Sequence, residues 1–155
     1  MENLERILKE HPFLGGLDDK YIKLLVGCAS NVVFKAGEFI FKEGGDADTF
    51  YFIRSGKVLI ETYVPQQGPV MIRQRESGEI LGWSWMVPPY KWHFDARATE
   101  LTRAIAMDGK CLREKCEKDH DLGYEVMQRF SLIIAERLEA TRLQLMDVYG
   151  KKNDN

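Results

Sequence analysis

Residues 35–58 have the sequence KAGEFIFKEGGDADTFYFIRSGKV, in which short apolar and aromatic runs alternate with glycine. Glycine adopts the backbone angles that sharp corners between strands require, so Gly37, Gly44 and Gly56 are predicted turn residues. The same alternation over residues 31–107 predicts a series of strands: Val32–Phe34, Phe39–Phe41, Phe50–Ile53, Val58–Tyr63, Val70–Arg75, Ala98–Glu100 and Arg103–Met107. Short strands at regular spacing favour a sandwich, roll or barrel over alternating strands and helices.

Helical patterns flank this β region on both sides. The first 27 residues have apolar residues at helical spacing, interrupted at His11-Pro12, and Asp18 is the predicted N-cap of the second of two helices. A short helix is expected through Leu112 and Cys116. Asp119 is the predicted N-cap of a helix over about residues 120–149, which Gly150 is expected to end. At about 30 residues this helix is roughly 45 Å long, more than a domain of this size needs to cover its core.

The last helix has two apolar faces. One has the steps of three and four residues that are typical of a coiled-coil seam, and its members are Met127, Phe130, Ile134, Leu138, Thr141, Leu145 and Val148. A second set lies partly on other faces and consists of Val126, Ile133, Leu143 and Met146. One face is expected to cover the β region and the other to meet a second copy, which predicts a homodimer. Packing of the seam on its own β region is the alternative.

Composition and charge exclude several classes of protein. The net charge is −2 at pH 7 and no dense run of Lys and Arg occurs, so direct nucleic-acid binding is not expected. No signal peptide is recognisable, and no apolar stretch approaches the ~20 residues of a membrane helix. Cys28, Cys111 and Cys116 cannot all pair within one chain, which predicts buried thiols and a reducing, cytoplasmic location. A length of 155 residues predicts one domain spanning residues 1–155.

Seven residues of the opening stretch resemble the pattern of the cyclic nucleotide-binding domain family: Gly37, Ile40, Gly44, Phe50, Tyr51, Ile53 and Gly56. The resemblance runs from about residue 10 to Gly150 and implies a mainly β fold, a β-roll of the jelly-roll (double-stranded β-helix) type. It also implies N-terminal helices, a short cassette helix and a long C-terminal dimerisation helix. The chain is similar to the effector domains of the catabolite activator and fumarate–nitrate regulator type, and it is expected to lack their helix-turn-helix DNA-binding domain.

In that family the ligand site is a phosphate-binding cassette, in which a Glu binds the ribose and an Arg binds the cyclic phosphate. The segment Gly78-Glu79-Ile80-Leu81-Gly82 matches the start of the cassette, but Trp83 stands where the family has Glu. Matching Ala98-Thr99 to the cassette's end places Ala96 at the arginine position and Arg97 one residue late, after a loop about four residues longer than usual. Because adjacent strand residues point to opposite faces, Arg97 is expected to point away from the pocket unless the loop shifts the register.

The dimer helix offers a further candidate. The segment Arg137-Leu138-Glu139-Ala140-Thr141 resembles the family's Arg-Leu-x-x-Thr segment, whose Thr reaches the purine; a neutral seam residue is the alternative for Thr141. Cyclic nucleotide is the candidate ligand, and the candidate ligand-binding residues are Gly82, Trp83, Ser84, Trp85, Ala96, Arg97, Ala98, Thr99 and Thr141. Hydrogen bonds to charged groups contribute about 1.5–3 kcal/mol each, so losing the Glu and the Arg weakens binding by roughly 10²–10⁴-fold.

An aromatic cluster surrounds the cassette and comprises Trp83, Trp85, Tyr90, Trp92 and Phe94. These rings either fill the vacated pocket as a rigid lid or form a cage for a flat apolar or cationic ligand. A cupin-like metal enzyme has a similar roll but needs several converging histidines, and of the three histidines only His93 lies in the β region. No catalytic or metal-binding residue is therefore predicted. Two functions remain possible. The first is a dimeric small-molecule sensor with altered or weakened cyclic nucleotide specificity that signals to a downstream protein. The second is a ligand-free interaction scaffold.

Overall fold

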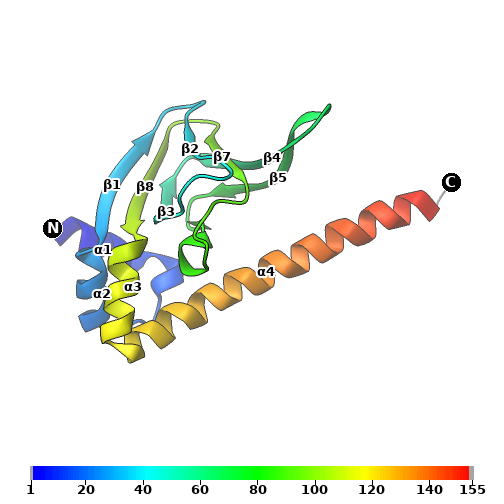
Figure 1. The fold of residues 1–155 in the computed structure, drawn as a ribbon. Coiled ribbons are helices and arrows are strands. Elements are labelled where there is room, and N and C mark those ends of the chain that lie inside the picture. Colours follow the sequence, from blue (N-terminus) through cyan, green and yellow to red (C-terminus); the bar gives the residue numbers. More distant parts are fainter. Residues whose placement is uncertain (1, 154–155) are drawn as a thin grey trace.

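Eight antiparallel strands form two four-stranded sheets, and a long helix runs past them (Figure 1). The first sheet has the strand order β1–β8–β3–β6 and the second has the order β2–β7–β4–β5. The computed structural model describes residues 2–153. The strands are β1 (Ala29–Phe34), β2 (Phe39–Phe41), β3 (Thr49–Ser55), β4 (Lys57–Val64), β5 (Gly68–Glu76), β6 (Ile80–Leu81), β7 (Asp95–Ala98) and β8 (Thr102–Asp108). The predicted mainly β roll is thereby confirmed.

Two strands differ from the sequence prediction. Strand β7 ends at Ala98, where a strand over Ala98–Glu100 was expected, and the two-residue β6 was not predicted. The alternating pattern of β7 is short and carries Asp95 and Arg97, so its sequence resembles that of a loop. It is a strand because it lies between β2 and β4 and pairs with both.

Two of the helices begin at their predicted caps, Asp18 and Asp119. The helices are α1 (Glu2–Glu10), η1 (Pro12–Leu14), α2 (Asp19–Val26), η2 (Ser84–Met86), α3 (Gly109–Lys118) and α4 (His120–Asn153). Asp18 accepts a hydrogen bond from the backbone N–H of Lys20 at 3.0 Å, and Asp119 accepts one from that of Leu122 at 3.2 Å. Of the helices between residues 2 and 153, none is long and apolar enough to cross a membrane.

The predicted end of the last helix at Gly150 is wrong, because α4 continues to Asn153. A single glycine lowers the stability of a helix by only about 1 kcal/mol relative to alanine, and it does not by itself end one. With 34 residues, α4 is about 51 Å long and extends well past the sheets (Figure 1).

The main core joins the helices to the first sheet, and α4 contributes to it through Leu122, Val126 and Phe130. The ring of Phe130 is fully buried and packs edge-to-face on Phe50 and Trp85, with ring centroids 5.1 and 5.2 Å apart. Phe130 is therefore not a seam residue, which corrects its place in the predicted stripe. A heptad pattern alone does not distinguish the intramolecular face of a helix from an intermolecular one.

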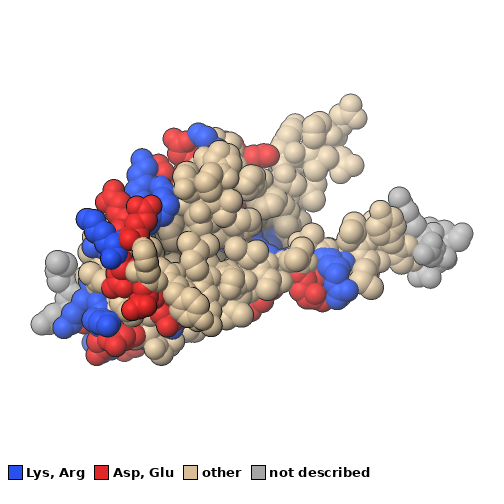
Figure 2. All heavy atoms as spheres, turned by 60° about the horizontal axis from the view of Figure 1, so that its bottom comes forward, with Lys and Arg blue, Asp and Glu red and all other residues tan. Residues whose placement is uncertain are grey.

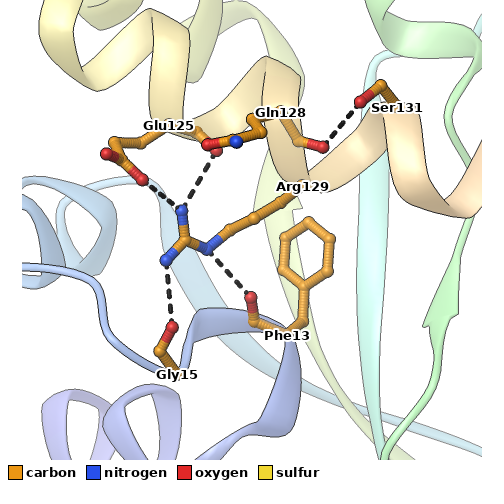
Figure 3. Close-up of polar contacts among 6 residues, drawn as sticks. All are labelled: Phe13, Gly15, Glu125, Gln128, Arg129 and Ser131. Atoms are coloured by element: carbon orange, nitrogen blue, oxygen red, sulfur yellow. Dashed lines mark hydrogen bonds and ion pairs between the residues drawn. The ribbon is translucent and has the colours of Figure 1, made fainter.

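Arg129 fastens the N-terminal turn to α4 (Figure 3). Its Nε donates to the carbonyl of Phe13 at 3.1 Å, and its Nη2 donates to that of Gly15 at 3.0 Å. Its Nη1 forms an ion pair with Glu125 one turn earlier, at 2.5 Å. One guanidinium group thus binds carbonyls that no helix or sheet hydrogen bond uses, which holds the η1 turn against α4.

Two cysteines differ from the expectation of buried thiols. Cys28, which precedes β1, and Cys111 on α3 form a disulfide, and their Cα atoms are 5.8 Å apart. Cys116 keeps a free thiol, and burial raises its pKa above the ordinary value. The pairing joins residues 83 positions apart in the sequence. Only the packing of α3 beside the end of α2 brings them together, so spacing along the chain does not predict the bond.

Candidate functional site

A small cavity lies where the cassette was predicted, between the end of β6 and the middle of α4. Its volume is about 20 Å³, and its walls are Phe41, Ile60, Leu81, Gly82, Trp83, Ser84, Trp92, His93, Phe94 and Arg137. A volume of this size holds about one water molecule. Three of the nine predicted ligand-binding residues, Gly82, Trp83 and Ser84, line it.

Aromatic rings occupy the rest of the space. The ring of Trp92 lies flat on Phe41, with centroids 3.7 Å apart and planes 7° from parallel. Trp92 is 6% exposed, and its six-membered ring lies directly over Gly82. A Cβ on Gly82 would lie 2.7 Å from Cη2 of Trp92, and the φ angle of Gly82 is +96°, so both packing and backbone require glycine there. These contacts agree with rings that fill the pocket.

The rings of the predicted aromatic cluster separate into different environments. Trp85 belongs to the main core and stacks on Phe50, with centroids 4.8 Å apart. Tyr90 lies outside the cavity, where the guanidinium of Arg113 covers its ring at 4.2 Å. Only Trp83, Trp92 and Phe94 of the cluster line the cavity. The five rings therefore do not form one cage.

Arg97 lies on the other face of its strand from the cavity. Ala96 pairs with Ile60 of β4, and both are buried on the inner face. Arg97 points outward, and its Nε donates to Oε1 of the buried Glu61 at 2.9 Å. The longer loop has therefore not shifted the register. Ala96 brings only a methyl group to the inner face.

The remaining candidates lie away from the cavity. Ala98 is buried in the sheet, and the exposed Thr99 donates through Oγ1 to the carbonyl of Lys57 at 3.3 Å. Thr141 is exposed on α4, one turn beyond the residues that reach the cavity. Ligand binding by any of the nine residues stays a prediction.

Arg137 is the site residue that the sequence analysis did not select. It reaches the cavity from α4, and its Nε is buried without a hydrogen-bond partner in the described part of the chain. Burial lowers the pKa of Arg137 to about 10, the charges of Arg75 and Arg73 act in the same direction, and Glu79 opposes them. A usable signal was present, because Arg137 opens the segment that singled out Thr141 and lies four residues, about one helical turn, before it.

Ser84 is buried, and His93 is exposed at the rim. Within residues 2–153, no three side chains of His, Cys, Asp or Glu gather as a metal site requires. The arrangement offers one buried cation, several aromatic faces and little empty space.

Comparison with known proteins gives a consistent picture. The family model for the cyclic nucleotide-binding domain matches residues 31–119. The CRP-like cAMP-activated global transcriptional regulator of Mycobacterium tuberculosis is 24% identical over 145 residues, which cover 94% of this chain and 63% of the regulator. The chain thus spans less than two thirds of the length of that relative.

Solved structures show the same likeness. A protein of Geobacter metallireducens named for cyclic nucleotide binding has a TM-score of 0.79 at 28% identity, with 89% of this chain and 99% of that one covered. A cyclic nucleotide-binding domain from Methylobacillus flagellatus has the same TM-score at 17% identity, covering 94% and 82%, a likeness of fold alone.

Proposed function

The chain belongs to the cyclic nucleotide-binding domain family, and we propose that it is a dimeric regulatory module whose ligand is not ordinary cyclic AMP. The fold and the regulatory relative support a sensing or regulatory role. The observation that carries the altered specificity is the small cavity of about 20 Å³ lined by Trp83 and Trp92. Pockets that bury a small ligand have volumes of about 300–1,000 Å³, so a cyclic nucleotide would have to displace Trp92 and its neighbours.

The chemistry of the walls supports the same proposal. Trp83 and Ala96 replace the two charged partners that the family resemblance implies, and Arg97 is already paired with Glu61. A cyclic phosphate entering this space would lose its hydration without equivalent partners. If an intact site binds at micromolar strength, the missing pair puts cyclic AMP at roughly millimolar strength or weaker.

Titration calorimetry with cyclic AMP tests this proposal. We expect no heat of binding below millimolar concentrations for the unaltered protein or for Arg97→Ala, because Arg97 points outward. The double variant Trp83→Glu with Ala96→Arg should improve the affinity. Micromolar binding that Arg97→Ala abolishes would show that Arg97 turns inward and that the cassette is functional.

We propose that α4 forms the dimer interface. Its residues Met127, Leu138, Leu145 and Val148 are exposed, at 45%, 71%, 55% and 54%. Figure 2 shows that charged side chains gather at the end of the molecule where the short helices lie, while the visible face of the protruding part of α4 has one acidic and basic group among uncharged side chains. A helix of about 51 Å with an uncovered apolar stripe is typical of a subunit interface.

Light scattering on a matched pair of variants tests the dimer. Leu138→Glu would bury a charge in the seam and should give a folded monomer. Leu143→Glu is the control, because residue 143 is also exposed but lies roughly 140° around the helix from residue 138. A monomeric unaltered protein, or equal dissociation by both variants, would contradict an α4 seam.

We further propose a cytoplasmic location and no direct contact with nucleic acid, in line with the net charge of −2. In a reducing compartment the Cys28–Cys111 pair would be open. A thiol count on protein purified without oxygen tests the location: three free thiols support it, and one opposes it.

The filled cavity also favours a second candidate, a ligand-free scaffold that binds a protein partner. A thermal-shift screen of cyclic mononucleotides, cyclic dinucleotides and common metabolites separates the two, because a ligand that binds the native state raises Tm. A reproducible shift supports the sensor, and its absence across the screen supports the scaffold.

A further inference from the structure

Three arginines converge between β5 and α4, and we refer to Arg73, Arg75 and Arg137 as the arginine cluster. In the β4–β5 ladder Arg75 pairs with Val58 and Arg73 pairs with Ile60. Directly paired residues project from the same face of a sheet, and Val58 and Ile60 are buried in the second core cluster. Arg73 and Arg75 therefore lie on the inner face of β5, while Arg137 approaches from α4.

This cluster has more positive charge than its neighbours neutralise. Arg75 is only 8% exposed, and its Nη1 pairs with Glu79 at 2.5 Å. The Nε groups of Arg75 and Arg137 are both buried and lack a hydrogen-bond partner among the described residues. Glu136 also acts on Arg73, but it is exposed, and solvent screens it.

Two arginines of the cluster have pKa values below the ordinary one. Burial and the neighbouring Arg75 lower the pKa of Arg73, and the pKa of Arg137 is lowered by burial and by both of the other arginines. Buried cations without a counter-ion are strongly disfavoured in a protein interior. Arg75 is buried and Arg137 is partly buried, and each has a buried Nε without a partner among the described residues, so a bound anion would offset part of this penalty.

Room for such an anion and for a body attached to it exists beside Arg75. A second cavity, of about 490 Å³, runs along α4, and Arg75 is the member of the cluster that lines it. Its other charged wall residues are Glu79, Arg129 and Glu136, and its apolar walls include Ile80, Leu132 and Ile133. The three guanidinium groups outnumber the carboxylates of Glu79 and Glu136, so the cluster keeps a net positive charge. A phosphate monoester carries about −1.5 to −2 at neutral pH and accepts several bidentate hydrogen bonds from arginine.

We propose that the arginine cluster binds the phosphate group of a phosphorylated small molecule, whose organic part lies in the cavity along α4. The anion is then held by β5 and the dimer helix, and not by the cassette. The anion would contact α4 through Arg137. Because the proposed function places the subunit interface on α4, binding would act on that interface. The binding itself does not depend on that function and is tested separately.

Thermal shift and calorimetry at low ionic strength test the proposal with three probes: inorganic phosphate, 5′-AMP and adenosine. We expect inorganic phosphate and 5′-AMP to raise Tm and adenosine to leave it unchanged. The affinity should fall steeply with added salt, because the contacts are ionic. Tighter binding of 5′-AMP than of inorganic phosphate would identify an organic phosphate, and equal binding would identify the free anion; both outcomes support the cluster.

Variants provide the decisive comparison. Arg137→Met removes a buried, unpartnered cation, so it should leave the Tm of the ligand-free protein unchanged or raise it, and it should weaken phosphate binding at least tenfold. Arg137→Lys should retain part of the affinity. Arg103→Met is the control, since Arg103 is exposed on β8, and it should bind phosphate normally.

Three results would overturn the proposal. One is the absence of any shift with inorganic phosphate and 5′-AMP. A second is an equal loss of binding in Arg103→Met, which would indicate a diffuse charge effect. A third is dissociation of the dimer in Arg137→Met together with unchanged phosphate binding, which would assign Arg137 to the subunit interface. Micromolar cyclic AMP binding through Arg97 would refute the proposed function and leave this inference standing.

Discussion

Replacing Phe130 by alanine should destabilise the protein more than any change on the exposed stripe of the same helix. The side chain of Phe130 is 0% exposed, and its ring packs on Phe13, Phe50 and Trp85 at centroid distances of 5.0, 5.1 and 5.2 Å. Phe→Ala in a packed core costs about 3–5 kcal/mol, and the three edge-to-face contacts place this one near the upper end, at about 4–5 kcal/mol. Domains are stable by about 5–15 kcal/mol, so about a quarter or more of the folding free energy would be lost.

Urea denaturation followed by tryptophan fluorescence measures the effect, because Trp85 lies against the altered ring. With a slope of about 2 kcal/mol per molar, the midpoint should fall by roughly 2 M. Leu138→Ala is the matched control: its side chain is 71% exposed, so it should change the stability of the subunit by less than about 0.5 kcal/mol. Measurement at two protein concentrations separates the contribution of dimerisation.

The reasoning would be refuted if Phe130→Ala lost less than about 1 kcal/mol, or if Leu138→Ala lost as much at low protein concentration. The first result would mean that Phe130 is not packed in the core of its own subunit, and the second that Leu138 packs within its own subunit. The two residues belong to one predicted stripe, so the comparison tests the tertiary assignment directly.

Three further outcomes are expected. Burial lowers the pKa of His11 to about 4, so between pH 6.5 and 4 the unfolded chain binds a proton that the folded chain does not. The free energy of unfolding should therefore fall by about 2 kcal/mol over that range. In His11→Gln, the urea midpoint should change less with pH over the same range. Gly82→Ala places a Cβ against Trp92 and should lower the free energy of unfolding by about 1–3 kcal/mol. Gly78 has a similar φ of +86° but open space around it, so Gly78→Ala should lower the free energy of unfolding less. Equal losses in the two variants would exclude the contact with Trp92 as the cause. Arg129→Met should cost about 2–3 kcal/mol in chemical denaturation and expose the N-terminal turn to proteolysis, and unchanged resistance would contradict its role as a fastener.

Local patterns predicted most of the fold because their signals act between near neighbours. Asp18 and Asp119 cap helices through backbone groups two or three residues away, so a short window of sequence contains the whole interaction. Turn glycines act in the same way: Gly37 and Gly56 have positive φ angles of +90° and +99° at strand ends. The position of strand β7 was predicted wrongly because its charged residues interrupt the alternation of apolar and polar side chains. Only its pairing with two neighbouring strands makes this segment extended.

For the site, the period of two along a strand predicted the outward direction of Arg97, and Glu61, 36 residues away, holds it there. That Ala96 and Trp83 replace charged partners is what the family resemblance predicts, and it stays a prediction. The sequence did not determine that Arg137 would reach the cavity, because that depends on how α4 crosses the roll.

What the amino-acid sequence by itself determined is the class of fold and the starts of the capped helices, both of which depend on short-range periodicity and backbone preference. Only the tertiary structure decided which face of α4 packs inward at Phe130, which cysteines meet across 83 residues, and how three arginines from β5 and α4 converge. Those features depend on contacts between distant segments, where many pairings satisfy the same local pattern and close packing selects one of them.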